Sequence, residues 1–251
     1  MSSSTHLSLH TWLKQATKAC SPQNPNAPSL LVQRVLKFDK AEQLTKGYGL
    51  ILTPKQIRKL NNLLGKLLKG RPLSAVLKQT DFHNIKLKVN SRVLSPRAET
   101  EVLIDYAIVS LPQKAKLIDL GTGSGAIGLA IYKARPDLSI TLTDIYEHNL
   151  MLAKRNARFN RLGESNHLHY LKSNLIKKVD QTFLYDSFFV ANLPYLNKNW
   201  TQLKHSRLKY EPSTALFAKQ NGLTLIFSLL QDLKQKDLLS TNNWLLLEHD
   251  P

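Results

Sequence analysis

The sequence predicts an α/β protein in which a small helical module precedes a mostly parallel β-sheet. Residues 1 to about 75 show helical patterns only. From Lys116 onward, short apolar runs alternate with helical segments, and this alternation is typical of parallel sheets. A Gly-rich turn, Gly121 to Gly125, joins the first apolar run to the helix after it. These features favour an open sheet with a ligand site at one edge.

The amino-terminal module is predicted to be helical, with one apolar face to bury. Four apolar residues mark a short amphipathic segment: Leu30, Leu31, Val35 and Leu36. A better-defined helix starts at Thr53, which can cap it, while Pro54 suits the first helical position and Gln56 completes a capping box. Leucines recur at helical spacing as far as Gly70, and Pro72 prevents the helix from continuing.

A β-hairpin is predicted between the two parts of the chain. After Asp81, apolar residues alternate with polar ones, which is typical of a half-buried strand: Ile85, Leu87 and Val89. Asn90-Ser91 can form the turn, and Val93-Leu94 can return as the second strand. We therefore expect a helical domain at 1–80, a hairpin linker at 81–95 and an α/β domain at 96–251.

The α/β part is predicted to contain five strands. They are expected at 117–120, 139–143, 167–172, 188–191 and 244–247. Helices are expected at 99–111, 124–134, 147–161 and 223–233. Because ligands bind at the carboxyl ends of the strands in open sheets, the residues that follow each strand are the candidates for a site.

The turn Gly121-Thr122-Gly123-Ser124-Gly125 is the first candidate binding element. Glycines let the backbone turn tightly and approach a ligand without an intervening Cβ. Asp144 ends the next predicted strand, where its carboxylate can accept hydrogen bonds from ribose hydroxyls. Both NAD and S-adenosylmethionine fit this pattern. No Walker lysine follows the glycines, which argues against a nucleoside triphosphate.

The stretch Asn192-Leu193-Pro194-Tyr195, after the fourth predicted strand, is the second candidate element. The side-chain oxygen of Asn192 and the main-chain carbonyl of Leu193 can accept both N–H groups of a planar amide or an exocyclic amine. Such contacts aim the nitrogen at a methyl donor and stabilise the positive charge that grows on it. Pro194 fixes the backbone, and Tyr195 can stack on a flat group. A nicotinamide enzyme would need a hydride partner and a general acid, and this region offers neither. A strand end followed by a plain proline turn is a structural alternative that would also explain the four residues.

The formal net charge of +17 favours an anionic partner, such as nucleic acid, a ribonucleoprotein or an acidic protein. A solvated lysine-rich surface explains the charge equally well, because the basic residues are spread along the chain. Cys20 is the only cysteine, which excludes internal disulfides and thiolate metal clusters and fits a cytoplasmic protein. No apolar run is long enough to span a bilayer, and the first residues do not form a secretory signal.

The two most distinctive segments are Pro96 to Glu101 and Tyr210 to Pro212. The glycine loop within Asp119 to Ile127 and the stretch Asn192 to Tyr195 are shared with many amino-methylating enzymes. Further matching segments are Gly70 to Leu73, Phe82, Val93 to Ser95, Asn156-Ala157, Ala215-Leu216 and Asn221 to Leu223. Together they resemble the HemK/PrmC family, the peptide chain release factor glutamine N(5)-methyltransferases. The resemblance runs from about residue 30 to the end of the sequence.

The resemblance implies a helical domain that helps to hold the release factor, a hairpin linker and a Rossmann-like class I methyltransferase domain. It implies methylation of the side-chain amide nitrogen of the glutamine in the Gly-Gly-Gln loop of release factors, by a cytoplasmic monomer that needs no metal. By motif position, S-adenosylmethionine would be held by Gly121, Thr122, Gly123, Ser124, Gly125, Asp144, Asn174, Leu175 and Asn192. Asn192 would be the catalytic residue, and residues 192–195 would clamp the glutamine amide. The basic surface is a candidate for contact with RNA or the ribosome.

Four departures from the family pattern keep alternatives open. Leu193 and Ala98 stand where the family has proline, and Asn174 stands where it has aspartate. Family members continue beyond the last residues with two more strands, so the resemblance implies that the domain is truncated. Asn-Leu-Pro-Tyr is also similar to the motif of ribosomal RNA adenine dimethylases. An adenine amino-methyltransferase acting on ribosomal RNA or DNA is therefore one alternative, and a catalytically impaired ribosome-associated binding protein is another.

Overall fold

The protein forms two compact units, Met1–Leu77 and Lys78–Pro251, each with its own hydrophobic core. The computed structural model describes residues 7–20, 24–163, 166–196, 210–217, 223–238 and 243–249. The boundary between the units lies three residues before the predicted limit of 80, and the hairpin belongs to the second unit instead of standing between two domains.

Unit 1 consists of helices in the part that the structure describes: α1 (Leu9–Ala19), α2 (Ala27–Leu36), α3 (Lys40–Lys46), α4 (Pro54–Leu68) and α5 (Leu73–Leu77). The start of α4 confirms the predicted capping box. The Thr53 hydroxyl accepts a hydrogen bond from the amide of Gln56, whose side chain accepts one from the amide of Thr53 at 2.8 Å. Beyond the helix, Gly70 has a φ of 82°. The core of unit 1 contains Trp12 and Leu60.

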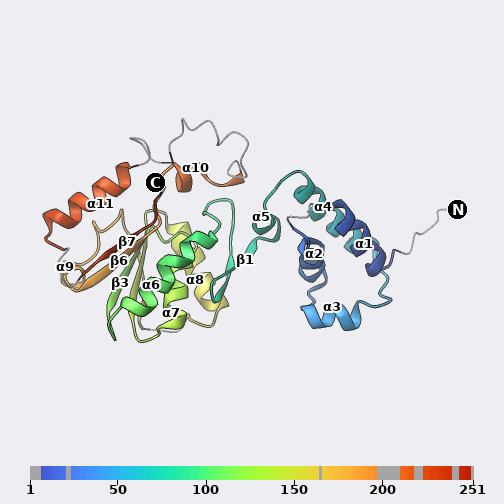
Figure 1. The fold of residues 1–251 in the computed structure, drawn as a ribbon, viewed down its shortest axis with the longest axis horizontal. Coiled ribbons are helices and arrows are strands. Elements are labelled where there is room, and N and C mark those ends of the chain that lie inside the picture. Colours follow the sequence, from blue (N-terminus) through green and yellow to red (C-terminus); the bar gives the residue numbers. More distant parts are fainter. Residues whose placement is uncertain are drawn as a thin grey trace. The chain divides into compact units, whose positions relative to one another are not determined.

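Unit 2 is built around a parallel sheet, which confirms the predicted fold class. Its strands are β3 (Lys116–Leu120), β4 (Ser139–Asp144), β5 (Leu168–Lys172), β6 (Ser187–Ala191) and β7 (Leu245–Leu247). They lie in the order β5-β4-β3-β6-β7, with every pair parallel. Figure 1 labels β3, β6 and β7 of this sheet. Each strand lies within a few residues of its predicted position.

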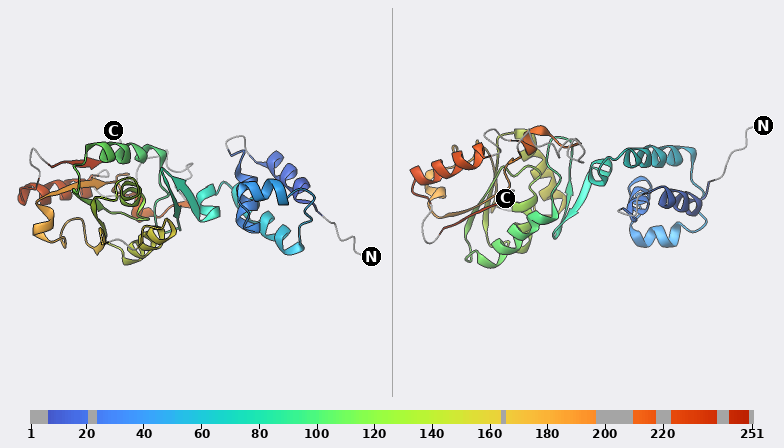
Figure 2. Two further views of the ribbon diagram at one scale, coloured as in Figure 1. Left: turned by 90° about the horizontal axis from the view of Figure 1, so that it is seen from below. Right: turned by 45° about the horizontal axis from the view of Figure 1, so that its top comes forward.

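Helices cover both faces of the sheet. Alternate residues of a strand point to opposite faces, and both sets are apolar here, so each face has a hydrophobic surface to bury. The helices are α6 (Glu101–Ser110), α7 (Ala126–Ala134), α8 (Glu147–Phe159), α9 (Gln181–Leu184), α10 (Ser213–Leu216) and α11 (Thr224–Gln235), and a short 3₁₀ helix, η1 (Ala98–Thr100), precedes α6. Leu117 and Val190 belong to the core under α6, α7 and α8, whereas Ile118 and Phe189 belong to the core shared with α9 and α11. Figure 2 shows α11 (red) and α6 (green) on opposite sides of the sheet. Among the described helices, none is both long and apolar enough to cross a membrane.

The hairpin differs from the prediction in its second strand. It pairs β1 (Gln79–Phe82) with β2 (Ile85–Lys88), and the chain turns at His83 and Asn84. Val93 and Leu94, the predicted return strand, do not pair with β2. The reason is that the other edge of β2 is already occupied by two side-chain amides, those of Asn156 in α8 and of Asn160, which caps the carboxyl end of α8. The amides of Lys86 and Lys88 donate to Asn160 and Asn156, at 3.0 and 2.8 Å. Val93 is buried in the core instead.

Candidate active site

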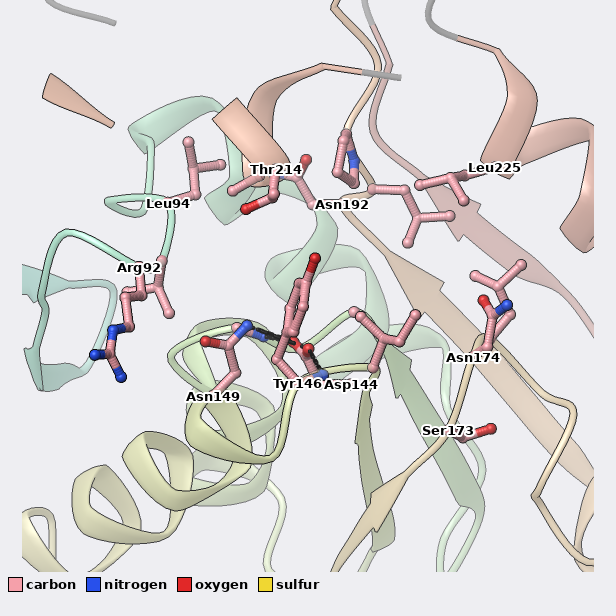
Figure 3. A pocket seen from close by; sticks show the side chains of 18 residues that line it. Arg92, Leu94, Asp144, Tyr146, Asn149, Ser173, Asn174, Asn192, Thr214 and Leu225 are labelled. Carbon is pink, nitrogen blue, oxygen red and sulfur yellow. Dashed lines mark hydrogen bonds between the residues drawn. The ribbon is translucent and has the colours of Figure 1, made fainter. Parts of the chain in front are cut away.

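A cavity lies at the carboxyl edge of the sheet, where the direction of strand addition reverses. β3 and β6 are neighbours, but the chain leaves β3 toward β4 and forms β6 only after β5. The loops after β3 and β6 therefore diverge and leave a crevice between them. The cavity has a volume of about 280 Å³ (Figure 3). Its lining includes residues that follow four strands: Gly121, Gly123, Asp144, Asn174, Leu175, Asn192, Leu193 and Pro194.

The glycine loop after β3 needs its glycines for both conformation and space. Gly121, Gly123 and Gly125 have φ values of 69°, 56° and 83°, in the left-handed region that side chains with a Cβ rarely adopt. A Cβ on Gly125 would lie 2.8 Å from Cδ1 of Leu129. Within the loop, the amide of Gly125 donates to the carbonyl of Thr122 at 2.9 Å. The loop is therefore tightly turned and leaves the backbone of Gly121 and Gly123 facing the cavity.

Asp119, at the end of β3, holds this loop from below. One oxygen of its carboxylate accepts from the hydroxyl of Thr122 at 2.6 Å and from the amide of Gly128 at 2.9 Å. The other oxygen is buried without a hydrogen-bond partner among the described residues. Burial raises the pKa of the Asp119 carboxyl group to about 6. Asp119 therefore supports the shape of the loop and is not itself part of the cavity wall.

Asp144 is the acidic residue of the cavity, at the end of β4. Its carboxylate accepts from the amides of Gly123 and Tyr146, at 3.0 and 2.8 Å. The side-chain nitrogen of Asn149 contacts both carboxylate oxygens, at 3.2 and 3.1 Å. A carboxylate offers about four acceptor positions. The four contacts from these three donors hold the carboxylate in place at the cavity wall, where a hydroxyl group of a ligand would compete with or share the contact from Asn149.

The third wall follows β5 and is partly apolar. Leu175 has a buried side chain and a φ of 51°, so the chain turns sharply at this residue. The neighbouring Ser173 holds the turn, since its hydroxyl accepts from the amide of Lys178 at 3.0 Å. Asn174 is exposed and lies on the opposite side of the cavity from Arg92 (Figure 3). With Ile145, Leu175 gives the cavity apolar surface on which a flat ring can lie.

Asn192 lies at the cavity wall after β6 and is held by a residue far away in the sequence. Its side-chain nitrogen donates to the hydroxyl of Thr100 at 3.2 Å, across 92 residues. Thr100 itself is buried. Because the amide nitrogen is engaged, the amide oxygen of Asn192 remains as the acceptor for a ligand.

The rest of the Asn-Leu-Pro-Tyr stretch divides between cavity and core. Leu193 lines the cavity, but its side chain is buried in the core on the α11 side of the sheet. Pro194 also lines the cavity, whereas Tyr195 is not part of its lining. The hydroxyl of Tyr195 lies 3.4 Å from a carboxylate oxygen of Glu248. The predicted stacking of Tyr195 on a substrate therefore stays a prediction.

The segment around α10 forms the wall above Asn192. Thr214 and Ala215 line the cavity, and Figure 3 shows Thr214 next to Asn192. An ion pair fixes this segment, since the guanidinium group of Arg97 lies 2.7 Å from the carboxylate of Glu211. Burial raises the pKa of Glu211, and the nearby charge of Arg97 opposes this shift. The two ends of the ion pair belong to the two most distinctive sequence segments noted above.

Several supporting residues were not predicted from the sequence as site residues. Asp119, Asn149, Thr100 and Asn156 hold the loops. Asp119, Thr100 and Asn156 belong to segments that resemble the family, and this was the signal in the sequence that could have revealed them. Asn156, for example, donates to the carbonyl of Ser124 at 2.8 Å and also to that of Lys88. Among the predicted residues, Thr122, Ser124 and Gly125 shape the glycine loop and lie outside the cavity lining. In the described residues, no group of three or more His, Cys, Asp or Glu side chains could hold a metal ion.

Comparison with known proteins gives the family. Residues 98–208 match the methyltransferase small domain family. The release factor glutamine methyltransferase of Coxiella burnetii is 34% identical over 246 residues, which cover 94% of this chain and 85% of that protein. This chain belongs to the release factor glutamine methyltransferase family. The enzyme of the same name from Aliivibrio fischeri is 29% identical over 97% of this chain and 85% of its own length. That of Escherichia coli is 34% identical over 79% of this chain and 69% of its own length.

The family membership confirms the predicted methyltransferase class, and the cavity fits S-adenosylmethionine. Its apolar wall at Ile145 and Leu175 suits an adenine ring. The carboxylate of Asp144 at the cavity wall suits a ribose hydroxyl, and the backbone of Gly121 and Gly123 suits close approach of the amino-acid part. The apolar wall, the carboxylate of Asp144 and the glycine backbone all line this one cavity.

Proposed function

We propose that this release factor glutamine methyltransferase family member transfers a methyl group to the side-chain amide nitrogen of the glutamine in the Gly-Gly-Gln loop of peptide chain release factors. Identity of 34% to the Coxiella burnetii enzyme across 94% of the chain supports this substrate. The observation that carries the proposal is the position of Asn192, an amide acceptor at the wall of the cavity, with its nitrogen engaged by Thr100.

The residues of the glycine loop, Asp144 and the wall at Asn174 and Leu175 would hold S-adenosylmethionine. When bound, this cofactor supplies a methyl group on a positively charged sulfur. Asp144 would accept a hydrogen bond from a ribose hydroxyl, while Gly123 and Tyr146 keep the carboxylate fixed. The chain contributes no covalent intermediate to this scheme, only binding and orientation.

Asn192 would orient the glutamine. Its side-chain oxygen and the main-chain carbonyl of Leu193 would accept the two N–H groups of the substrate amide, so that the nitrogen faces the cofactor. Since both acceptors carry partial negative charge, they also stabilise the positive charge that develops on the nitrogen. Pro194 would keep the two acceptors at a fixed separation. Tyr195 would reach the substrate only from outside the present cavity lining.

We further propose that the protein acts as a cytoplasmic monomer and that part of its basic surface contacts RNA. Adenine amino-methylation of ribosomal RNA or DNA is the second candidate, favoured by the Asn-Leu-Pro-Tyr stretch. The two candidates place the same residues around different planar groups. They therefore differ in the substrate and not in the geometry of the acceptors.

Radiolabelled methyl transfer separates the two candidates. The full chain is incubated with labelled S-adenosylmethionine and, in parallel, with a release factor, with the same factor carrying Ala in place of the loop glutamine, and with ribosomal RNA. We expect label in the unmodified release factor only. Label in RNA together with none in the release factor would overturn the proposal.

A further inference from the structure

One face of α4 in unit 1 carries a line of basic side chains, which we call the α4 basic stripe: Lys55, Arg58, Lys59 and Lys66. At 3.6 residues per turn and 1.5 Å per residue, the four positions fall within about 100° of the helix circumference and extend over roughly 16 Å. All four side chains are exposed, as is that of Asn62, which lies in the same arc. The stripe contains no apolar or aromatic residue.

The orientation of this stripe is fixed by the opposite side of the helix. Leu60 is fully buried, and the other apolar residues of α4 pack against the same core: Ile57, Leu63, Leu64 and Leu67. A hydrogen bond of 2.8 Å from the indole nitrogen of Trp12 to the side-chain oxygen of Asn61 adds a polar link. These contacts fix the rotation of α4 about its own axis, and the stripe therefore faces away from the core of unit 1.

The charges of the stripe are not neutralised. None of its four side chains forms an ion pair with a residue that the structure describes. No acidic residue occurs between Glu42 and Asp81 in the sequence. The first turn of α4 contains no acid, so Lys55 lies at the positive end of the helix dipole, where a cation is unfavourable. Lys55, Arg58 and Lys59 are also like-charged neighbours at the spacings that repel each other on a helix.

The shorter helix α3 of the same unit shows the usual arrangement. Asp39 and Glu42 lie at its positive end, and Lys46 pairs with Glu42 at 2.7 Å. Unit 1 as a whole has twelve Lys and Arg residues and two acidic residues, so it holds ten of the seventeen net positive charges of the chain. The positive charge concentrated on α4 thus destabilises this helix locally. An anionic partner would relieve the repulsion between these side chains.

We propose that the α4 basic stripe binds the phosphate backbone of double-helical RNA. Protein interfaces are depleted in lysine and depend on aromatic or apolar anchors, and the stripe has none. Single-stranded nucleic acid is held by aromatic side chains that stack on bases, which are also absent from the stripe. Lysine and arginine alone suit phosphates that are regularly spaced along a duplex. The choice of RNA over DNA rests on the proposed function in translation.

Fluorescence anisotropy with a labelled 20-base-pair RNA duplex tests the proposal, using the full chain between 50 and 200 mM salt. The test variant combines Lys55→Gln, Arg58→Gln, Lys59→Gln and Lys66→Gln. The control variant combines Lys14→Gln, Lys18→Gln, Arg34→Gln and Lys40→Gln. It removes an equal number of charges, three lysines and one arginine, from exposed positions elsewhere in unit 1. Circular dichroism and thermal unfolding establish that both variants fold as the wild type does.

We expect the test variant to bind the duplex at least about tenfold more weakly and to lose roughly 3 to 4 from the slope of log affinity against log salt, since each phosphate contact contributes about 0.9. The control variant should keep most of the affinity. Equal losses in both variants would overturn the proposal in favour of a diffuse charge effect. Tighter binding of a DNA duplex of the same sequence would overturn the choice of RNA.

Methyl transfer to an isolated release factor, measured on the same variants, separates this proposal from the proposed function. We expect kcat and KM to stay at the wild-type values in both. A test variant that binds RNA normally but has a raised KM for the release factor would show that the stripe contacts protein and would overturn the RNA proposal. A wild-type chain that binds RNA but methylates no release factor would overturn the proposed function alone.

Discussion

Replacing Thr100 by Val tests whether this residue orients the side-chain amide of Asn192, which we propose to be catalytic. Val has nearly the shape of Thr, so the change removes the hydroxyl that accepts from Asn192 at 3.2 Å and leaves the packing of a buried position largely intact. A neutral hydrogen bond contributes about 0.5–1.5 kcal/mol net. If that energy holds Asn192 in its productive rotamer, its loss lowers the methyl-transfer rate by a factor of roughly 2 to 13. Since Asn192 is only half-buried, water can satisfy the freed nitrogen and the fold should persist.

Single-turnover methyl transfer to a release factor measures this effect, and calorimetric titration with S-adenosylhomocysteine measures cofactor affinity in parallel. We expect Thr100→Val to slow the transfer step while cofactor affinity stays within about twofold, and Thr100→Ser to restore the rate, because it keeps the hydroxyl. An unchanged rate for Thr100→Val would refute the positioning role. An equal loss of rate in the Val and Ser variants would show that packing of the methyl group, and not the hydrogen bond, matters.

Three further substitutions probe the cofactor side of the cavity. Asp144→Asn should weaken S-adenosylhomocysteine binding by about tenfold or more, because hydrogen bonds to a charged acceptor contribute about 1.5–3 kcal/mol. Calorimetric titration measures this affinity, with Asp137→Asn as a control distant from the cavity. Unchanged affinity in Asp144→Asn would contradict the prediction. Gly125→Ala should lower the free energy of unfolding by about 1–3 kcal/mol through its left-handed backbone, measured by urea denaturation, with Gly65→Ala in an open helical position as the control. Asp119→Asn should remove a pH dependence of the free energy of unfolding. The pKa of Asp119 is about 6 in the folded state and 3.8 in the unfolded state, so the folded state binds the proton more tightly. The stability that this group contributes therefore falls as pH rises from 4 to 6. The difference between wild type and Asp119→Asn should change by about 2 kcal/mol across that range. A pH-independent difference would mean that folding does not shift the pKa of Asp119.

The parts of the fold that sequence predicts well are those with local signals. The capping box at Thr53 and Gln56 fixes the start of α4, and the structure places it at that residue. The apolar strands of the parallel sheet were equally visible, because strands buried on both faces form continuous apolar runs. The glycine loop and Asp144 were found because their spacing along the chain follows from the geometry of one strand-helix-strand unit.

The parts that could not be predicted depend on contacts between distant segments. The hairpin partner of β2 could not be predicted from alternation, because β1 contains a single apolar residue, Phe82, whereas Val93-Leu94 offers two. What decides between them is the pair of amides from Asn156 and Asn160, about seventy residues further on. The hydrogen bond from Asn192 to Thr100 could not be predicted either, because the segment that contains Thr100 resembles the family but does not show which residue it contacts.

Leu193 shows how the structure changes the meaning of a sequence difference. From the sequence, a leucine between Asn192 and Pro194 weakens the resemblance to enzymes that methylate protein and favours those that methylate RNA. In the structure its side chain is 3% exposed and lies in the core on the α11 side of the sheet. A Cβ on Gly121 would lie 3.0 Å from Cδ2 of Leu193, so this side chain fills the space beneath the glycine loop. Leu193 therefore couples the loop expected to hold the cofactor to the stretch expected to hold the substrate. Any residue that fills this space and leaves the main-chain carbonyl in place would serve the same purpose, and the identity of residue 193 does not decide between a glutamine and an adenine.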